Sequence, residues 1–185
     1  MRKWVFVLPL VALAATVSAQ GISGSAHDFS SKGWNSSGQI CLPCHTPHNA
    51  MASGKGNVLW NHTSSTATYT LYDPGYAQPG PSSKKCLSCH DGTVALDSFG
   101  GTTGNTPIAG KARLGTDLSD DHPVGVIYNA TAPGYTIPTL TKLVGPGNNM
   151  VECDSCHNVH NENGAAKLLR TANTASALCL DCHAK

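Results

Sequence analysis

The sequence predicts a mostly irregular chain with a few short α-helices and minimal β-sheet. Glycine and proline are abundant, with 19 and 11 among 185 residues, and aromatic side chains make up only 6%. No long stretch repeats its apolar residues with the period of a helix or alternates them like a strand. All eight cysteines belong to four copies of the pattern C-x-x-C-H. Because a chain with so few large apolar side chains builds little core, a group bound at these motifs must supply the missing apolar bulk.

The four motifs share their spacing and their last residue. C-x-x-C-H is the attachment motif of c-type haem, in which two thiols add across the vinyl groups and the adjacent histidine binds the iron. Zinc knuckles and a secreted disulfide scaffold are the alternatives, but neither requires a histidine after every second cysteine. We predict four covalent haems, attached at Cys41, Cys44, Cys86, Cys89, Cys153, Cys156, Cys179 and Cys182, with His45, His90, His157 and His183 as proximal ligands.

The N-terminal residues have the features of a signal peptide. A basic start at residues 2–3 precedes an apolar run over 4–17, and residues 17–19 form a small-residue cleavage site. The apolar run is too short for a membrane span to be expected. We predict a signal peptide over 1–19 and a single haem-binding domain over 20–185, exported to the periplasm or onward to the cell surface.

The charge of the chain argues against two classes of partner. Without its leader the chain carries 10 basic and 11 acidic side chains, and the propionates of four haems would make the loaded protein more acidic. No run or stripe of basic residues is present. Nucleic acid and anionic membrane surfaces are therefore not expected as partners.

The ligand opposite each proximal histidine decides what a haem can do. Only two methionines, Met51 and Met150, lie in the mature chain, whereas five histidines remain outside the motifs. We predict that the sixth ligands are His27, His48, His122 and His160, with His62 in reserve. An iron with two histidines has no vacant site for a substrate, so the chemistry left is electron transfer rather than catalysis.

Two of these histidines lie in repeated stretches, Cys44–Asn49 and Cys156–Asn161. His48 and His160 each follow a proximal histidine by three residues, which on a helical turn would let one segment hold two neighbouring irons. His122 precedes a proline that fixes the backbone, as suits a ligand presented from a loop.

Short helices are expected at the motifs. Serines at 82–83 and polar residues at 171–173 are placed to cap helices that run into His90 and His183. Two short strands are expected, at residues 124–128 and 136–144.

Several segments together resemble a family of multihaem c-type cytochromes. They are Ser25-Ala-His-Asp-Phe-Ser, Cys41-Leu-Pro-Cys-His-Thr-Pro-His-Asn, Leu59-Trp-Asn-His, the stretch Cys86–Asp97 and Asp121-His-Pro-Val-Gly. The likeness spans nearly the whole mature chain and is greatest to tetrahaem OmcE-type extracellular cytochromes, whose subunits polymerise into conductive filaments. It implies bis-histidine haems in a continuous stack, little regular secondary structure and one axial histidine donated by the neighbouring subunit.

We therefore expect an electron conduit that assembles head to tail into an extracellular filament and exchanges electrons with other cytochromes and extracellular acceptors. His48 is the expected bridge, binding the haem of His157 or of His183 in the adjacent subunit. A monomeric periplasmic electron shuttle is the alternative. A multihaem oxidoreductase with an open iron site is a third hypothesis, although all four motifs here end in histidine.

Overall fold

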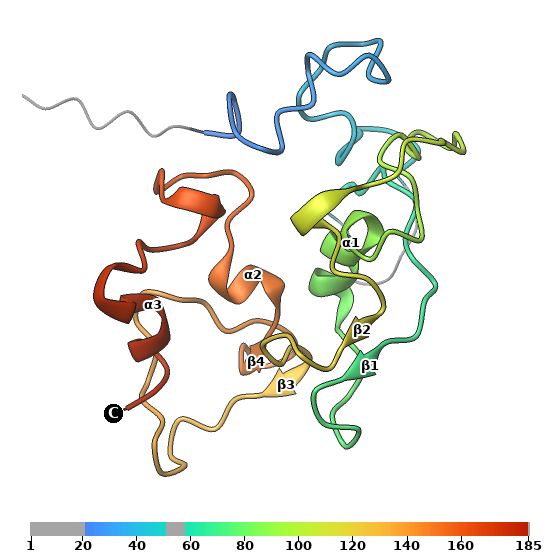
Figure 1. Cartoon of the computed structure of the whole chain (residues 1–185). Coiled ribbons are helices and arrows are strands. Elements are labelled where there is room, and N and C mark those ends of the chain that lie inside the picture. Colours follow the sequence, from blue (N-terminus) through green and yellow to red (C-terminus); the bar gives the residue numbers. More distant parts are fainter. Residues whose placement is uncertain (1–20, 51–57, 185) are drawn as a thin grey trace, which may run out of the picture.

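The structure, a computed structural model, describes residues 21–50 and 58–184. The predicted signal peptide over 1–19 and Met51 lie outside the described residues. Irregular loops make up most of the described chain, with a few short helices and two small sheets (Figure 1). The predicted fold class is therefore confirmed.

Every helix in the described part that has α geometry carries all or part of a C-x-x-C-H motif. These helices are α1 (Pro81–His90), α2 (Cys153–Cys156) and α3 (Ala177–Leu180), and short 3-10 helices cover Gly110–Ala112, Ala166–Leu168 and Thr174–Ser176. Strand β1 (Thr70–Leu71) pairs in parallel with β2 (Asp117–Leu118), and β3 (Val126–Ile127) pairs antiparallel with β4 (Met150–Val151). None of the helices that the structure describes is long and apolar enough to cross a membrane.

The first motif forms a turn instead of the expected helix. The N–H of His45 donates to the carbonyl of Cys41 at 2.8 Å, which is the i to i−4 bond of a single helical turn. His45 then enters an isolated β-bridge with Trp60, so the chain becomes extended at once. The equivalent backbone bond recurs in the third and fourth motifs, at 3.1 and 2.9 Å. All four motifs thus share one tight turn, whatever follows it.

The predicted cap at residues 82–83 is wrong, although α1 does end at His90 as expected. Gly80 is the N-cap residue and Pro81 takes the first helical position. Proline suits this position, because an N–H there would have no partner within the helix. Ser83 is fully buried inside the helix instead.

The last motif follows its prediction in part. Asn173 stands before the first helical residues, and its side-chain oxygen accepts the N–H of Leu178 at 3.2 Å. The helix α3 nevertheless stops at Leu180, before the second cysteine of the motif.

Only one of the two predicted strands is present. Residues 126–127, within the predicted 124–128, form β3. Residues 136–144 instead form a loop over the last motif, where the Asp181 carboxylate accepts the backbone N–H groups of Thr139 at 2.8 Å, Leu140 at 3.0 Å and Thr141 at 2.8 Å. Because one carboxylate takes these donors, they are not available to a strand ladder.

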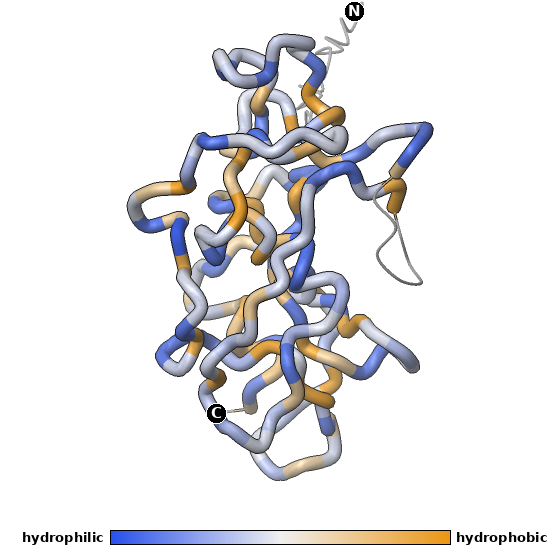
Figure 2. Tube along the Cα trace, turned by 90° about the vertical axis from the view of Figure 1, so that its right-hand side faces the viewer, coloured by the Kyte–Doolittle hydropathy of each residue, from blue (hydrophilic) through white to orange (hydrophobic). Residues whose placement is uncertain are grey.

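Buried apolar side chains are few. Among the described residues they are Trp60, Tyr69, Leu87, Leu118, Val144 and Leu168. Only Tyr69, Leu87 and Leu118 form one cluster, where α1 meets the β1–β2 pair. Apolar segments are scattered along the rest of the trace (Figure 2). This small core agrees with the expectation that a bound group must supply apolar bulk.

We predict that the Asp181 clamp depends on pH. Burial raises the pKa of Asp181, but hydrogen bonds from Thr141, Thr139 and Leu140 outweigh burial and lower it to about 2. A lowered carboxyl pKa stabilises the fold above the ordinary value of 3.8, and this contribution is lost as the pH falls towards 2. Hydrogen-exchange protection of amides 139–141, corrected for intrinsic rates, should be constant above about pH 4 and fall between about pH 4 and 2.

Asp181→Asn should lose much of that protection already at neutral pH. Asp117→Asn is the matched control, because the Asp117 carboxylate bonds only to the nearby N–H of Ser119. Native-like protection in Asp181→Asn at neutral pH would contradict the clamp.

Candidate haem-binding sites

Three of the predicted proximal histidines lie beside three of the predicted sixth ligands. The ring centroids are 5.9 Å apart for His27 and His90, 6.2 Å for His45 and His160, and 6.3 Å for His122 and His183. An imidazole nitrogen binds a first-row metal at about 2 Å, and the ring centre lies about 1 Å beyond it. Two imidazoles on opposite sides of one metal therefore have centroids about 6 Å apart. The spacing of each pair fits one iron between the rings.

Backbone carbonyl groups orient three of the proximal rings. The Nδ1 atoms of His45, His90 and His157 lie 2.5, 2.7 and 3.1 Å from the carbonyl oxygens of Val58, Ala112 and Lys167. An Nδ1–H donated to a carbonyl leaves the lone pair on Nε2, which is the tautomer that binds a metal. Each carbonyl belongs to a later segment that folds back over its motif. Sequence reasoning missed these groups, since a carbonyl oxygen has no sequence signal.

His27 is held by the turns of the N-terminal segment. The side-chain nitrogen of Asn35 donates to the carbonyls of Phe29 and Gln39, each at 3.1 Å, and the Phe29 ring packs edge-on against His27. Burial, with the charges of His90 and His157 as smaller causes, lowers the pKa of His27 to about 4. The ring is therefore neutral at neutral pH, as a metal ligand must be.

His62 differs from the other spare histidines because both of its ring nitrogens lie against backbone carbonyl oxygens. Its Nδ1 lies 2.8 Å from the carbonyl oxygen of Thr63 and its Nε2 lies 3.0 Å from that of Ala95. The ring is only 2% exposed and lies against the sulfur of Cys89. This arrangement leaves no nitrogen for a metal, which agrees with holding His62 in reserve.

The two repeated stretches take the same conformation, but it is not the helical turn that we expected. His45 and His157 each enter an isolated β-bridge, with Trp60 and Leu169. The repeats then end alike, with asparagines in the left-handed conformation at φ 55° and 53°, which asparagine tolerates better than most residues. His48 and His160 are therefore presented from exposed turns rather than from helices.

His48 and His157 complete the predicted set of eight ligands without lying beside each other. Both side chains are exposed. Among residues 21–50 and 58–184, three imidazole pairs are present, as given above. Neither His48 nor His157 belongs to any of them. One predicted proximal histidine and one predicted distal histidine thus have no partner imidazole among the described residues.

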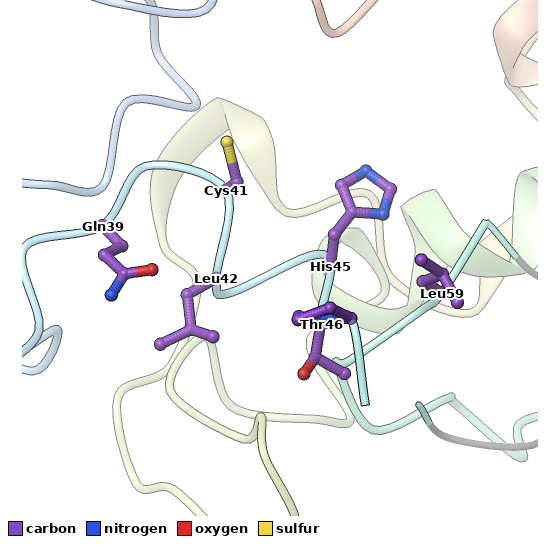
Figure 3. A pocket seen from close by; sticks show the side chains of 7 residues that line it. Gln39, Cys41, Leu42, His45, Thr46 and Leu59 are labelled. Atoms are coloured by element: carbon purple, nitrogen blue, oxygen red, sulfur yellow. The ribbon is translucent and has the colours of Figure 1, made fainter. Parts of the chain in front are cut away.

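The cysteines do not form either alternative structure. No disulfide joins any two of the eight cysteines, so no disulfide scaffold is present. Over the described residues, no three side chains of His, Cys, Asp or Glu gather at one point as a zinc knuckle requires. In the first motif Cys41 and His45 project to the same side of the turn, and both line a cavity of about 210 Å³ (Figure 3). A thiol and an imidazole on one side are what thioether attachment with axial ligation requires.

Unsatisfied buried atoms give a further test of fit. Among the described residues they are Nδ1 of His27, Nε1 of Trp60 and Oδ1 of Asn161. The Trp60 ring packs edge-on against His45, with centroids 6.1 Å apart. Buried polar groups are normally hydrogen-bonded, and haem propionates would offer acceptors to the N–H groups of His27 and Trp60. The residues present therefore fit haem.

Comparison with known proteins gives one match, at the C-terminal end of the chain. A family model described as the doubled CXXCH motif matches residues 145–185, which contain the third and fourth motifs. No curated protein matches the chain. The paired motifs indicate covalently bound haem c, and the match supports a multihaem c-type cytochrome.

Proposed function

We propose that the protein is a tetrahaem electron-transfer cytochrome in which every iron is bound by two histidines. The observation that carries this proposal is the separation of about 6 Å in three histidine pairs, each built on a different motif. Bound haem c supplies reversible one-electron chemistry at its iron. The chain's own side chains hold both faces of the iron, keep substrates away from it and fix the spacing of the motifs.

Each distal histidine belongs to one motif. His160 serves the first motif, His27 the second and His122 the fourth. These ligands lie far along the chain from the histidines that they face, so coordination ties together segments that share little apolar core. Folding and haem binding are then one event, and the haem-free chain is largely unfolded.

Methionine ligation is not supported for Met150. Its backbone pairs with Ile127 and Val144, and its side chain packs against Gly145. Histidine on both faces of each iron favours the lower range of reduction potentials. It also leaves no open position, so electron transfer is proposed rather than an oxidoreductase activity.

The fourth pair is completed between subunits. His48 and His157 are the two ligands left over, and His183, the other candidate for the bridge, already lies beside His122. Residues 47–49 form an exposed turn from which His48 can reach another molecule. A contact that joins this turn to the third motif of the next copy uses two different surfaces. Such a contact builds an open filament unless its rotation closes a ring.

The alternative within one chain has a specific geometric form. Because the two stretches repeat, a symmetric arrangement would pair His48 with His157 as it pairs His45 with His160. Only His45 and His160 have their rings beside each other, with centroids 6.2 Å apart. This asymmetry favours ligation across a subunit boundary.

We place the filament outside the cytoplasm, from the periplasm to the cell surface, with redox cytochromes and extracellular acceptors as its partners. A monomeric periplasmic shuttle would carry the same motifs. It would differ from a filament in its molecular mass in solution.

The first prediction here concerns attachment. Mass spectrometry of the mature protein should show four haem additions and no free thiol, because all eight cysteines belong to motifs. Replacing both Cys86 and Cys89 by Ser should give three additions. Bound zinc or intact disulfides in the native protein would contradict the proposal.

The second prediction concerns ligation within the chain. Replacing His27, His122 or His160 by Ala should each convert one iron from low-spin to high-spin, which electron paramagnetic resonance detects. His62→Ala is the control: all irons should stay low-spin, while the loss of buried hydrogen bonds lowers stability by about 1–3 kcal/mol. A high-spin signal in His62→Ala alone would overturn the assignment.

The third prediction concerns assembly. His48→Ala should keep four attached haems, show one high-spin iron and fail to form filaments in electron microscopy. Thr46→Ser, which keeps the hydroxyl that donates to the carbonyl of His48 at 2.8 Å, should assemble normally. Native-like filaments with every iron low-spin in His48→Ala would exclude the bridge. Soluble monomers of the native protein with every iron low-spin would favour the periplasmic shuttle.

A further inference from the structure

The helices of the second and third motifs meet at one buried carboxylate. Glu152, only 3% exposed, is the N-cap residue of α2. Its side chain accepts the N–H of Gly80 at 2.9 Å and the hydroxyl of Ser83, and it also takes part in the capping box of its own helix with Ser155. One carboxylate therefore bonds to the starts of two helices, at residues that are 72 positions apart in the sequence.

The two helix starts depend on each other. Gly80, the N-cap residue of α1, makes no side-chain capping bond of its own, so Glu152 supplies the acceptor that such a helix start requires. In return the Ser83 hydroxyl accepts the N–H of Cys153 at 2.9 Å. Ser82 adds a third link by donating to Asp154 at 2.8 Å. Polar bonds thus link α1 and α2, which lie beside each other (Figure 1).

The approach leaves no space for a larger residue at position 80. A Cβ atom added to Gly80 would collide with a carboxylate oxygen of Glu152. The Glu152 side chain therefore lies directly against the α1 backbone. A small change on either side would move one helix relative to the other.

This junction determines where two attachment sulfurs lie. Cys86 and Cys153 are the first cysteines of the second and third motifs, and both are tied to this junction. The Cys86 thiol donates to the carbonyl of Ser82 at 3.7 Å, and the N–H of Cys153 donates to the Ser83 hydroxyl. In a thioether-linked haem, each such sulfur is two covalent bonds from the macrocycle. The contact between α1 and α2 therefore sets the distance between the attachment points of two haems.

We propose that Glu152 is a positioning residue that fixes the second attachment motif against the third. The proposal rests on the proposed haem attachment at these motifs. It assigns to the carboxylate a role beyond helix capping, because removing it should change the relation between two redox groups as well as stability.

Glu152→Gln tests this role with little change in shape. The variant keeps one acceptor oxygen but replaces the other by an NH2 group, so the bonds from Gly80 and Ser83 cannot both remain. We expect four attached haems, a changed Soret couplet in circular dichroism and shifted reduction potentials. Gly80→Ala, which displaces the carboxylate without altering its charge, should change the couplet in the same way.

Glu162→Gln is the matched control. Glu162 is exposed, and its carboxylate accepts only the local side-chain N–H of Asn158 at 2.8 Å. This variant should keep the native couplet and potentials. If Glu152→Gln and Gly80→Ala only lower the melting temperature while the couplet and potentials stay native, Glu152 is a helix cap and the proposal is wrong. Absence of haem from the native protein would instead overturn the proposed function.

Discussion

The meeting of histidines from distant segments is the constraint on which the rest of this structure depends. His27 reaches a motif in the middle of the chain, and His160 reaches back to the first motif. Apart from two prolines, only six apolar side chains are buried in the described part, and they cannot hold such segments together alone. Two coordinate bonds to one iron would join each pair with a fixed geometry. The irregular backbone is then a consequence, because loops need only present a ligand at each end.

A second layer of polar bonds orders each motif in the folded chain, in addition to the histidine pairs. Asp91 after the second motif, Glu152 before the third and Asp181 within the fourth each accept several hydrogen bonds from another segment. At the first motif Asn61 plays this part, donating its side-chain N–H to the carbonyl of Leu42 at 2.7 Å. Most of these links are buried or half-buried, so they favour one arrangement over its competitors. A chain without a large core can hold its attachment sites in place in this way.

The parts that could be predicted from the sequence are those with a short-range chemical reason. The spacing of two thiols and a histidine follows from the chemistry of attachment, and low apolar content predicts a loop-rich fold. The partner of each histidine depends on long-range folding, so His122 could be named as a candidate ligand, but its place beside His183 could not be predicted. The prediction of a strand over 136–144 was wrong because the Asp181 carboxylate accepts hydrogen bonds from backbone N–H groups of that segment. Asp181 lies forty residues beyond Thr141 in the sequence. The junction at Glu152 left no signal, since capping between distant helices has no fixed sequence spacing.

A subunit contact made by a coordinate bond would differ in kind from one made by apolar area. An apolar patch can join partly built chains, whereas His48 and His157 can be bridged only when an iron is already attached to the third motif. Assembly would therefore follow attachment, and a chain that lacks this haem could not extend the filament in that direction. Exposure of both rings in the single chain is what such an order requires, because each must remain accessible after the other three pairs have formed. Each of the two repeats has one histidine paired within the chain and one left open, and the two open rings would link haem loading to polymerisation.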